Sequence, residues 1–160
     1  MIFVVLGTHE LPFSRLLQEV DQLIESGNIT EEVIVQVGHT PYRSPNMTFI
    51  PFMTYSEMEE YYKQARVIIT HGGTGSITTG VKMNKKVIAS PRWRHHGEHN
   101  DDHQLEIVRQ FYNAGYILYW DEGMELKDII VQIKDFEPKQ FVSGREKILR
   151  IIEDFIQKEA

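Results

Sequence analysis

The sequence predicts an α/β fold, a doubly wound and mostly parallel sheet. Short apolar stretches alternate with helical patterns along the chain, as in proteins built from βα units. The first stretch, residues 2–6, is apolar throughout, which is typical of a parallel strand covered by helices on both faces. The loops at Gly7, Gly38, Gly72 and Pro91 all follow such stretches, so we expect them to gather at one edge of the sheet.

Each element has its own start or stop signals. We expect strands at residues 2–6, 33–37, 47–52, 67–71, 86–90 and 116–120. We expect helices from Pro12 to Gly27, from Thr54 to Ala65, from the Gly72 loop to Met83, from Asp101 to Ala114, from Leu126 to Lys134, and from Ser143 onward. Three of them begin with capping boxes, in which Thr54 pairs with Glu57, Asp101 with Gln104 and Ser143 with Glu146.

Composition limits the class of protein. At 160 residues the chain is expected to form a single domain, residues 1–160, with one well-buried core. The net charge of −6 argues against a broad nucleic-acid surface, and the absence of cysteine excludes disulfides and thiolate chemistry. No apolar run is long enough to span a membrane, and residues 1–6 are interpreted as a core strand and not as a signal peptide. We therefore expect a cytoplasmic protein.

The glycine-rich segment from His71 to Ser76 is the strongest functional signal. It follows a β-branched strand and opens a helix, so several free backbone N–H groups and a positive helix end point at one place. Gly72, Gly73 and Gly75 permit a tight turn and a close approach, while Thr74 and Ser76 add hydroxyl donors. This pattern predicts a phosphate site; the alternative is a helix entry that merely needs glycines.

Several motifs together resemble one enzyme family. His71-Gly-Gly-Thr-Gly-Ser76 is followed by Pro91-Arg92, by Gly97-Glu98-His99 and by Asp102-His103-Gln104. This combination resembles the nucleotide-sugar half of GT-B glycosyltransferases, which has a Rossmann-like fold. The opening residues 5–9 and the turn at residues 36–39 are similar as well. The resemblance is greatest to small subunits of two-part enzymes, namely the UDP-N-acetylglucosamine transferase of asparagine-linked glycosylation and bacterial exopolysaccharide or capsule galactosyltransferases.

The resemblance implies a function and partners. A UDP-sugar would donate a galactose-like or N-acetylglucosamine-like hexose to a lipid-linked saccharide in exopolysaccharide or capsule biosynthesis. A full GT-B enzyme has two domains, so a membrane-associated partner subunit would carry the acceptor site and recruit this chain to the inner face of the membrane. The last helix, with Leu149, Ile152, Phe155 and Ile156, and the loops at Tyr42 and Trp93 are candidate docking surfaces. Homodimerisation of the isolated chain is the alternative use of such a surface.

The resemblance also implies a set of site residues. The nucleotide-sugar-binding candidates are Gly7, Thr8, Gly38, His71, Gly72, Gly73, Thr74, Gly75, Ser76, Arg92, Glu98, His99, Asp102, His103 and Gln104. Asp102 and Gln104 resemble the family's acidic-amide pair that holds the sugar hydroxyls. Many relatives hold the ribose with an acidic residue where this sequence has Thr79, so nucleoside preference is open. No DxD motif follows a strand, and we expect no metal and no cofactor in the transfer.

Other interpretations of these residues remain open. No residue stands out as the general base; His9, Glu98 and His99 are the candidates. His71 could be purely structural, and Asp102 could serve only to cap its helix. A metal-dependent hydrolase could use the side chains of His95, His96, Glu98, His99, Asp101, Asp102 and His103. A nucleotide-sugar-binding module without catalytic activity is the third alternative.

Overall fold

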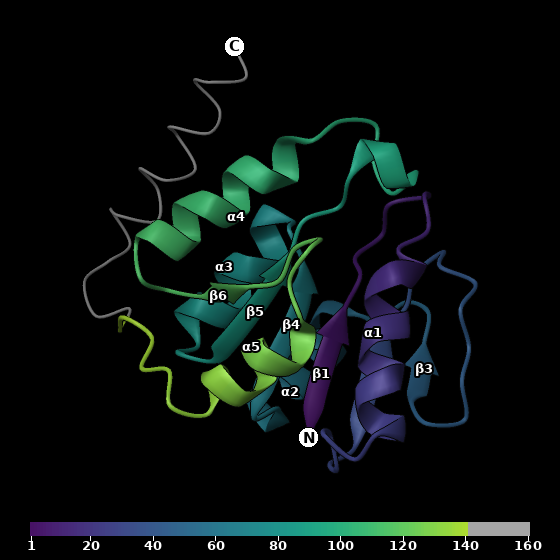
Figure 1. Ribbon diagram of the computed structural model, residues 1–160, viewed down its shortest axis with the longest axis horizontal. Helices are drawn as coiled ribbons and strands as arrows, with labels where there is room; N and C mark the ends of the chain where they lie inside the picture. The colour runs from purple at the N-terminus through teal and green to yellow at the C-terminus, as the bar shows by residue number, and fades with distance from the viewer. Residues whose placement is uncertain (141–160) are drawn as a thin grey trace.

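A six-stranded sheet forms the centre of the protein, in the order β3-β2-β1-β4-β5-β6. The computed structural model describes residues 1–140 (Figure 1). Every pair of neighbouring strands is parallel. The strands are β1 (Ile2–Val5), β2 (Val33–Gln36), β3 (Thr48–Ile50), β4 (Val67–His71), β5 (Lys86–Ser90) and β6 (Leu118–Tyr119). The doubly wound, mostly parallel sheet predicted from the sequence is therefore confirmed.

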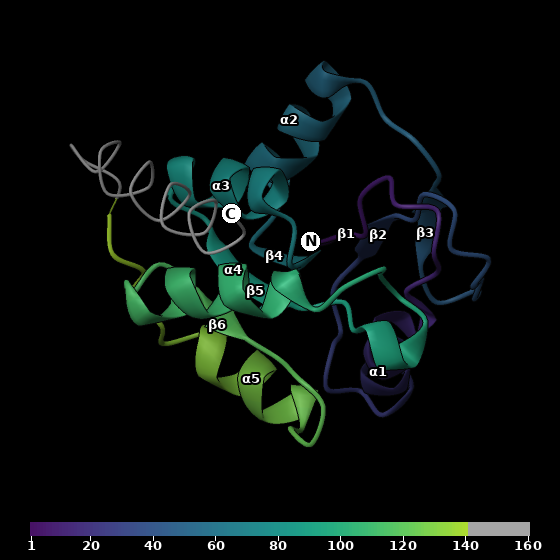
Figure 2. The same cartoon turned by 90° about the horizontal axis from the view of Figure 1, so that it is seen from above.

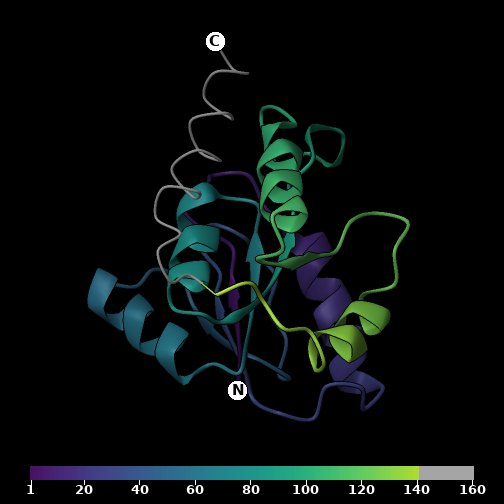
Figure 3. The same cartoon turned by 90° about the vertical axis from the view of Figure 1, so that its left-hand side faces the viewer.

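Helices cover both faces of this sheet (Figures 2 and 3). They are α1 (Ser14–Glu25), α2 (Tyr55–Gln64), α3 (Thr74–Lys82), α4 (His103–Asn113) and α5 (Leu126–Ile133), with a short 3₁₀ helix, η1 (Arg94–His96). Helices α1 and α5 share one apolar cluster with alternate residues of the central strands, such as Ile2 and Val4. The intervening residues, such as Phe3 and Val5, pack against α2, α3 and α4 in a second cluster. Both faces of β1 are thus buried, as its all-apolar sequence requires.

The order of the strands places a crevice between β1 and β4. From β1 the chain first proceeds to β2 and β3 on one side, and then returns to β4, β5 and β6 on the other. Where the order of winding reverses, the loops after the two strands diverge and leave room for a ligand at the carboxyl edge. Those loops begin at Gly7 and Gly72, two of the four expected at one edge. They lie at the upper edge in Figure 1.

The capping box at Thr54 is confirmed, with both reciprocal bonds to Glu57 present. The capping box predicted at the start of α4 is wrong, because the N-cap residue is Asp102 and its side chain makes no capping hydrogen bond. Asp101 accepts a hydrogen bond from the backbone N–H of His103, 3.0 Å away, but Gln104 does not return to the cap. Its side chain turns into the interior, because two buried backbone N–H groups there need an acceptor.

Other differences concern the ends of elements. Pro12 lies outside α1, which begins two residues later, and the strand expected at 116–120 is shortened to Leu118–Tyr119, although the N–H of Trp120 still donates to the carbonyl of Ala89 in β5 at 2.9 Å. The helix predicted from Ser143 lies outside the described residues. None of the helices within residues 1–140 has the length and hydrophobicity needed to cross a lipid bilayer.

Candidate functional site

Two adjoining cavities lie at the carboxyl edge of the sheet, beside the start of α3. The first, of about 320 Å³, is lined by Val5, Gly7, Thr8, Gln36, Phe52, Met53, Met58, His71, Gly73, Gly75 and Ser76. The second, of about 430 Å³, lies between α2 and α3 and includes Thr78, Thr79, Tyr55 and Lys82 in its wall. They share Met58, Gly75 and Ser76. Together they form a continuous candidate site at the crevice between β1 and β4.

Close backbone approaches around the ring of His71 define the floor of the first cavity. A Cβ atom on Gly7 would lie 2.6 Å from the Nε2 atom of His71, and one on Gly73 would lie 2.3 Å from its Cε1 atom. Gly7 also has a φ of +79°, which side chains rarely tolerate. A Cβ on Gly38 would lie 2.5 Å from the carbonyl oxygen of Gly7. The glycines therefore allow the ring to pack between the loops that follow β1 and β4.

Gln36 joins the loops after β1 and β3 through its buried amide. Its Oε1 atom accepts from the N–H of Gly7 at 2.9 Å, and its Nε2 atom donates to the carbonyls of Gly7 and Pro51 at 3.0 and 2.9 Å. We did not predict this residue as part of the site. A single amide at the end of an otherwise apolar strand was the signal that could have identified it.

The first turn of α3 presents free donors to the cavities. The N–H groups of Thr74, Gly75 and Ser76 belong to the first turn, where a helix has no acceptor of its own for them. A Cβ on Gly75 would meet no protein atom within 4 Å, so this residue faces open space. Tyr62 of α2 secures the turn, since its buried hydroxyl donates to the carbonyl of Ser76 at 2.9 Å. The positive end of the helix dipole adds to the attraction for an anion.

A relay of hydrogen bonds determines which nitrogen of His71 carries the proton. The Oε1 atom of Gln104 accepts from the backbone N–H groups of Gly72 and Arg92, both at 3.0 Å. Its amide nitrogen therefore faces the Nδ1 atom of His71, 3.3 Å away, and donates to it. In neutral His71 the proton then resides on Nε2, which donates to the hydroxyl of Ser76 at 3.2 Å. Ser76 lines both cavities, so its own hydroxyl hydrogen is available to donate to a ligand there.

The surroundings of His71 keep its ring neutral. Desolvation by burial is the largest cause, and the positive charge of Arg92 adds to it, so that the pKa of His71 falls to about 3. A neutral ring has one donor and one acceptor nitrogen, as the relay requires. His71 is therefore a fixed hydrogen-bonding group at neutral pH and not a proton carrier.

Arg92 places a buried positive charge near His71. Its side chain is only 1% exposed, and its guanidinium donates to the carbonyls of Leu6, Leu11 and Glu98 at 2.6, 2.8 and 3.0 Å. Burial lowers the pKa of Arg92 to about 10, so it stays charged at neutral pH. Carbonyl dipoles solvate this cation, and the buried carboxylate of Glu98, which pairs with Arg15, offsets part of its charge. Since Arg15 and Arg92 are two cations beside this one carboxylate, the group keeps an excess of positive charge and favours an anionic ligand nearby.

Comparison with known proteins identifies the family. Residues 1–158 match the glycosyltransferase family 28 C-terminal domain. The chain belongs to this family. The UDP-N-acetylglucosamine transferase subunit ALG13 of Candida albicans is 30% identical to it over 79 residues, which are 49% of this chain and 26% of that protein. The match therefore spans only 26% of the length of this relative.

Solved structures support the fold of this family 28 domain. The NMR solution structure of ALG13 matches it with a TM-score of 0.61 and 19% identity, covering 94% of this chain and 93% of the other. The crystal structure of Acinetobacter baumannii MurG matches with a TM-score of 0.55 and 14% identity, over 82% of this chain and 39% of MurG. The predicted resemblance to the donor-binding half of GT-B glycosyltransferases is therefore confirmed.

In this family 28 domain, Glu98 lies inside the protein and not in the cavities. Its carboxylate accepts two hydrogen bonds from Arg15, from Nε and a terminal nitrogen, both at 3.0 Å, and one from the N–H of Trp93 at 3.0 Å. Arg15 also lies over the rings of Phe13 and Trp120. These protein donors occupy the carboxylate, and it lines neither of the two cavities, so the geometry favours a structural role for Glu98 over a role as general base.

His9 and His99 stack on each other near this edge, with ring centroids 4.5 Å apart. The Nδ1 atom of His9 accepts from the N–H of Leu11 at 3.0 Å, so a neutral ring carries its proton on Nε2. Desolvation, followed by the charge of His99, lowers the pKa of His9. In this arrangement His9 is a donor and not a base.

The remaining predicted residues lie around the site in different ways. Gly72 is buried against Gln104, while Asp102 and His103 are exposed at the start of α4. One carboxylate oxygen of Asp102 accepts from the N–H of Arg94 at 2.9 Å. Gln104 uses both ends of its amide inside the protein, so of the predicted sugar-binding pair only Asp102 faces solvent. Its role toward a sugar stays a prediction.

The residues of the alternative metallohydrolase site do not converge as a set. Within residues 1–140, one group of three histidine or acidic side chains places all its ligand atoms within 4.8 Å of one another, and it consists of His95, His96 and Glu122. Glu122 was not among the predicted ligands. The hydrolase interpretation is therefore not favoured by the arrangement of Glu98, His99, Asp101 and His103.

Proposed function

We propose that this chain is the donor-binding subunit of a UDP-sugar-dependent hexosyltransferase. A membrane-associated partner subunit would carry the lipid-linked saccharide acceptor. The observation that carries the proposal is the first turn of α3, whose free N–H groups and Ser76 hydroxyl face a cavity at the crevice between β1 and β4. The family to which the chain belongs and the name of its Candida albicans relative support a nucleotide-sugar donor.

The diphosphate of the donor would bind at the start of α3. The N–H groups of Thr74, Gly75 and Ser76 are donors, and Arg92 places a buried positive charge near His71. Donors fixed before the ligand arrives can stabilise the negative charge that develops on the leaving diphosphate. These donors would take the place of a divalent ion, and that the transfer uses no metal stays part of the proposal.

The nucleoside would extend toward α2. Phe52 is 51% exposed and Tyr55 is 83% exposed, and they line the first and the second cavity respectively. Such exposed aromatic rings offer a surface on which a pyrimidine base can stack. Thr79 lies in the second cavity, where its hydroxyl donates to the carbonyl of Gly75 at 2.9 Å. Its oxygen can still accept a hydrogen bond from a ribose hydroxyl.

Replacing Gly75 tests the phosphate site. Since this residue faces open space, Gly75→Val should fill the cavity beside the helix terminus without displacing protein atoms. We expect UDP binding, measured by calorimetry, to weaken by at least about 100-fold, as loss of two hydrogen bonds to a charged group predicts. Gly73→Val is less informative, because its side chain would collide with His71.

Ser56→Val is the matched control for that variant. Ser56 occupies the same second position of α2 as Gly75 does of α3, and it is exposed. Both variants should unfold at similar urea concentrations, and only the Gly75 variant should lose UDP binding. Unchanged UDP affinity in a folded Gly75→Val protein would contradict the proposed phosphate site.

A transfer assay tests the need for a partner. We expect no transfer from a panel of UDP-sugars to a lipid-diphosphate-sugar acceptor by the purified chain, and transfer when a membrane-associated partner is added. The sugar that supports transfer would identify the hexose. Robust transfer by this chain alone would contradict the two-subunit proposal. UDP-sugar binding without transfer, even with the partner, would favour the non-catalytic alternative.

A further inference from the structure

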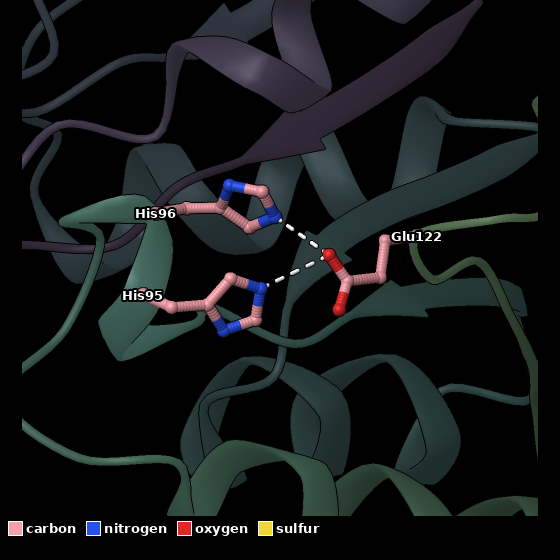
Figure 4. Close-up of side chains that lie close together, drawn as sticks. All are labelled: His95, His96 and Glu122. Carbon is pink, nitrogen blue, oxygen red and sulfur yellow. Dashed lines mark hydrogen bonds and ion pairs between the residues drawn. The ribbon is translucent and has the colours of Figure 1, made fainter.

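Two imidazole rings and one carboxylate converge outside the candidate donor site (Figure 4). His95 and His96 belong to η1, and Glu122 follows β6 in the loop that leads to α5. The Nε2 atoms of the two histidines lie 3.0 and 2.8 Å from the same carboxylate oxygen, Oε2 of Glu122. Three potential metal-ligand atoms, two imidazole nitrogens and one carboxylate oxygen, thus lie close together at the surface, although they come from two separate segments of the chain.

Contacts around this cluster hold the two loops in place. The indole N–H of Trp93 donates to the carboxylate of Asp121 at 2.7 Å, and the same oxygen accepts from the N–H of Glu122 at 2.8 Å. The ring of Trp93 also contacts that of His95, with centroids 5.1 Å apart. The contacts of Trp93 with Asp121 and His95 therefore join η1 to the loop after β6, the two segments that carry His95, His96 and Glu122.

We propose that His95, His96 and Glu122 bind a divalent transition-metal ion, and that this ion is Zn²⁺. Two imidazole nitrogens with one carboxylate oxygen suit Zn²⁺, and do not suit Mg²⁺ or Ca²⁺, which take oxygen ligands. All the ligand atoms lie within 4.8 Å of one another, so small rotations of exposed side chains can bring each to about 2.0–2.2 Å from one ion.

The neighbouring histidines show why this group is the candidate. His99 and His103 also pair with one carboxylate, but they contact different oxygens of Asp101, at 3.1 and 3.3 Å. Those three side chains do not bring their donor atoms together as His95, His96 and Glu122 do. Because both rings are directed at one carboxylate oxygen, an ion bound between them would have three protein ligands on one side. Water would complete its coordination on the other side. Bound there, the ion links η1 to the loop after β6.

Binding of Zn²⁺ to untagged full-length chain, treated with a chelator and dialysed, tests the proposal directly. We expect calorimetry to give one Zn²⁺ per chain. Co²⁺ bound at the same site should give the visible absorption of a low-coordinate ion with nitrogen and oxygen ligands. His95→Ala, His96→Ala and Glu122→Gln should each weaken binding by more than about tenfold, since even the loss of an outer partner has an effect of that size. All three residues are exposed, so the variants should fold.

His103→Ala and His39→Ala are the controls, because both remove an exposed histidine outside the cluster. They should bind Zn²⁺ as the parent does. The proposal is overturned if the parent shows no saturation below about 1 mM Zn²⁺. It is also overturned if His103→Ala lowers the affinity as much as His96→Ala, or if Glu122→Gln has no effect. UDP binding serves as a separate readout, so failure here leaves the proposed transferase function standing.

Discussion

Gln104 determines more of the candidate site than its sequence context indicates. The motif around it suggested a helix cap and a contact to the sugar, and the structure instead places its amide between Gly72, Arg92 and His71. Local sequence could not predict this, because the partners lie 12–33 residues away. The glycines around His71 were identified from the sequence as candidate site residues. Their packing against the imidazole ring was not, because it depends on distances between loops.

Gln104→Glu should reverse the tautomer of His71. A carboxylate can still accept from the N–H groups of Gly72 and Arg92, but it cannot donate to the Nδ1 atom of His71. The ring proton should move to Nδ1, and the Ser76 hydroxyl should then donate to Nε2 instead of facing the ligand. We expect the ¹⁵N chemical shifts of Nδ1 and Nε2 of His71 to exchange. UDP affinity should fall by about tenfold, the effect of one lost hydrogen bond.

The control for that variant is Gln104→Met, which removes both functions of the amide. It should destabilise the fold by about 2–6 kcal/mol, since two buried N–H groups lose their acceptor at about 1–3 kcal/mol each. Gln104→Glu should instead keep most of the stability. If it retained the Nε2–H tautomer together with the parent's UDP affinity, the relay would not govern the donor site.

His71 should also make stability depend on pH. Its pKa is about 3 in the folded protein, against 6.5 for an ordinary histidine, so between these values the unfolded chain binds a proton that the folded protein does not. The stabilising contribution is therefore complete above pH 6.5 and is lost as pH falls toward 3. The slope of this contribution is at most about 1.4 kcal/mol per pH unit.

Urea unfolding of the parent and of His71→Asn at several pH values between about 4 and 7 measures this effect. The parent should lose free energy of unfolding more steeply with falling pH than the variant does. The lowered pKa of His9 acts in the same direction in both proteins, so the difference between the slopes belongs to His71. Parallel slopes would show that His71 is not held neutral.

At the scale of elements, α2 and α3 were predictable and their connection was not. The capping box at Thr54 and the apolar spacing of α2 were sufficient to place that helix. Nothing in the sequence indicated that Tyr62 would direct its hydroxyl to the carbonyl of Ser76, since a tyrosine on an apolar face is ordinarily a core residue. That single bond connects the helix beside the second cavity to the helix that presents the phosphate donors.

Tyr62→Phe should loosen the first turn of α3. It removes only the hydroxyl, so we expect a loss of about 1 kcal/mol in the free energy of unfolding, measured with urea. UDP affinity should fall modestly, because the N–H donors lose part of their support. Tyr61→Phe is the matched control. Tyr61 stacks on Phe3, and within residues 1–140 its hydroxyl forms no hydrogen bond to α3 of the kind that Tyr62 forms. Equal effects of the two substitutions would contradict the connection.

At the scale of the whole molecule, the strand pattern predicted both the fold class and the edge that holds the site. All-apolar strands and right-handed crossovers leave few arrangements, and the observed order β3-β2-β1-β4-β5-β6 is one of them. The cluster of His95, His96 and Glu122 could not be predicted in the same way. Its acidic member lies 26 residues or more from the histidines, in a loop whose position depends on how β6 joins the sheet.

The burial of Arg92 affects how the protein should respond to salt. Dissolved ions screen charges at a surface, but they cannot surround a guanidinium that is 1% exposed and enclosed by carbonyl groups. The chain as a whole carries a net charge of −6, which instead repels an approaching nucleotide. Raising NaCl from about 50 to about 500 mM shortens the Debye length to roughly 4 Å and weakens that repulsion first. UDP should therefore bind as tightly at high ionic strength as at low, or slightly more tightly, whereas a site made of surface lysines would release it.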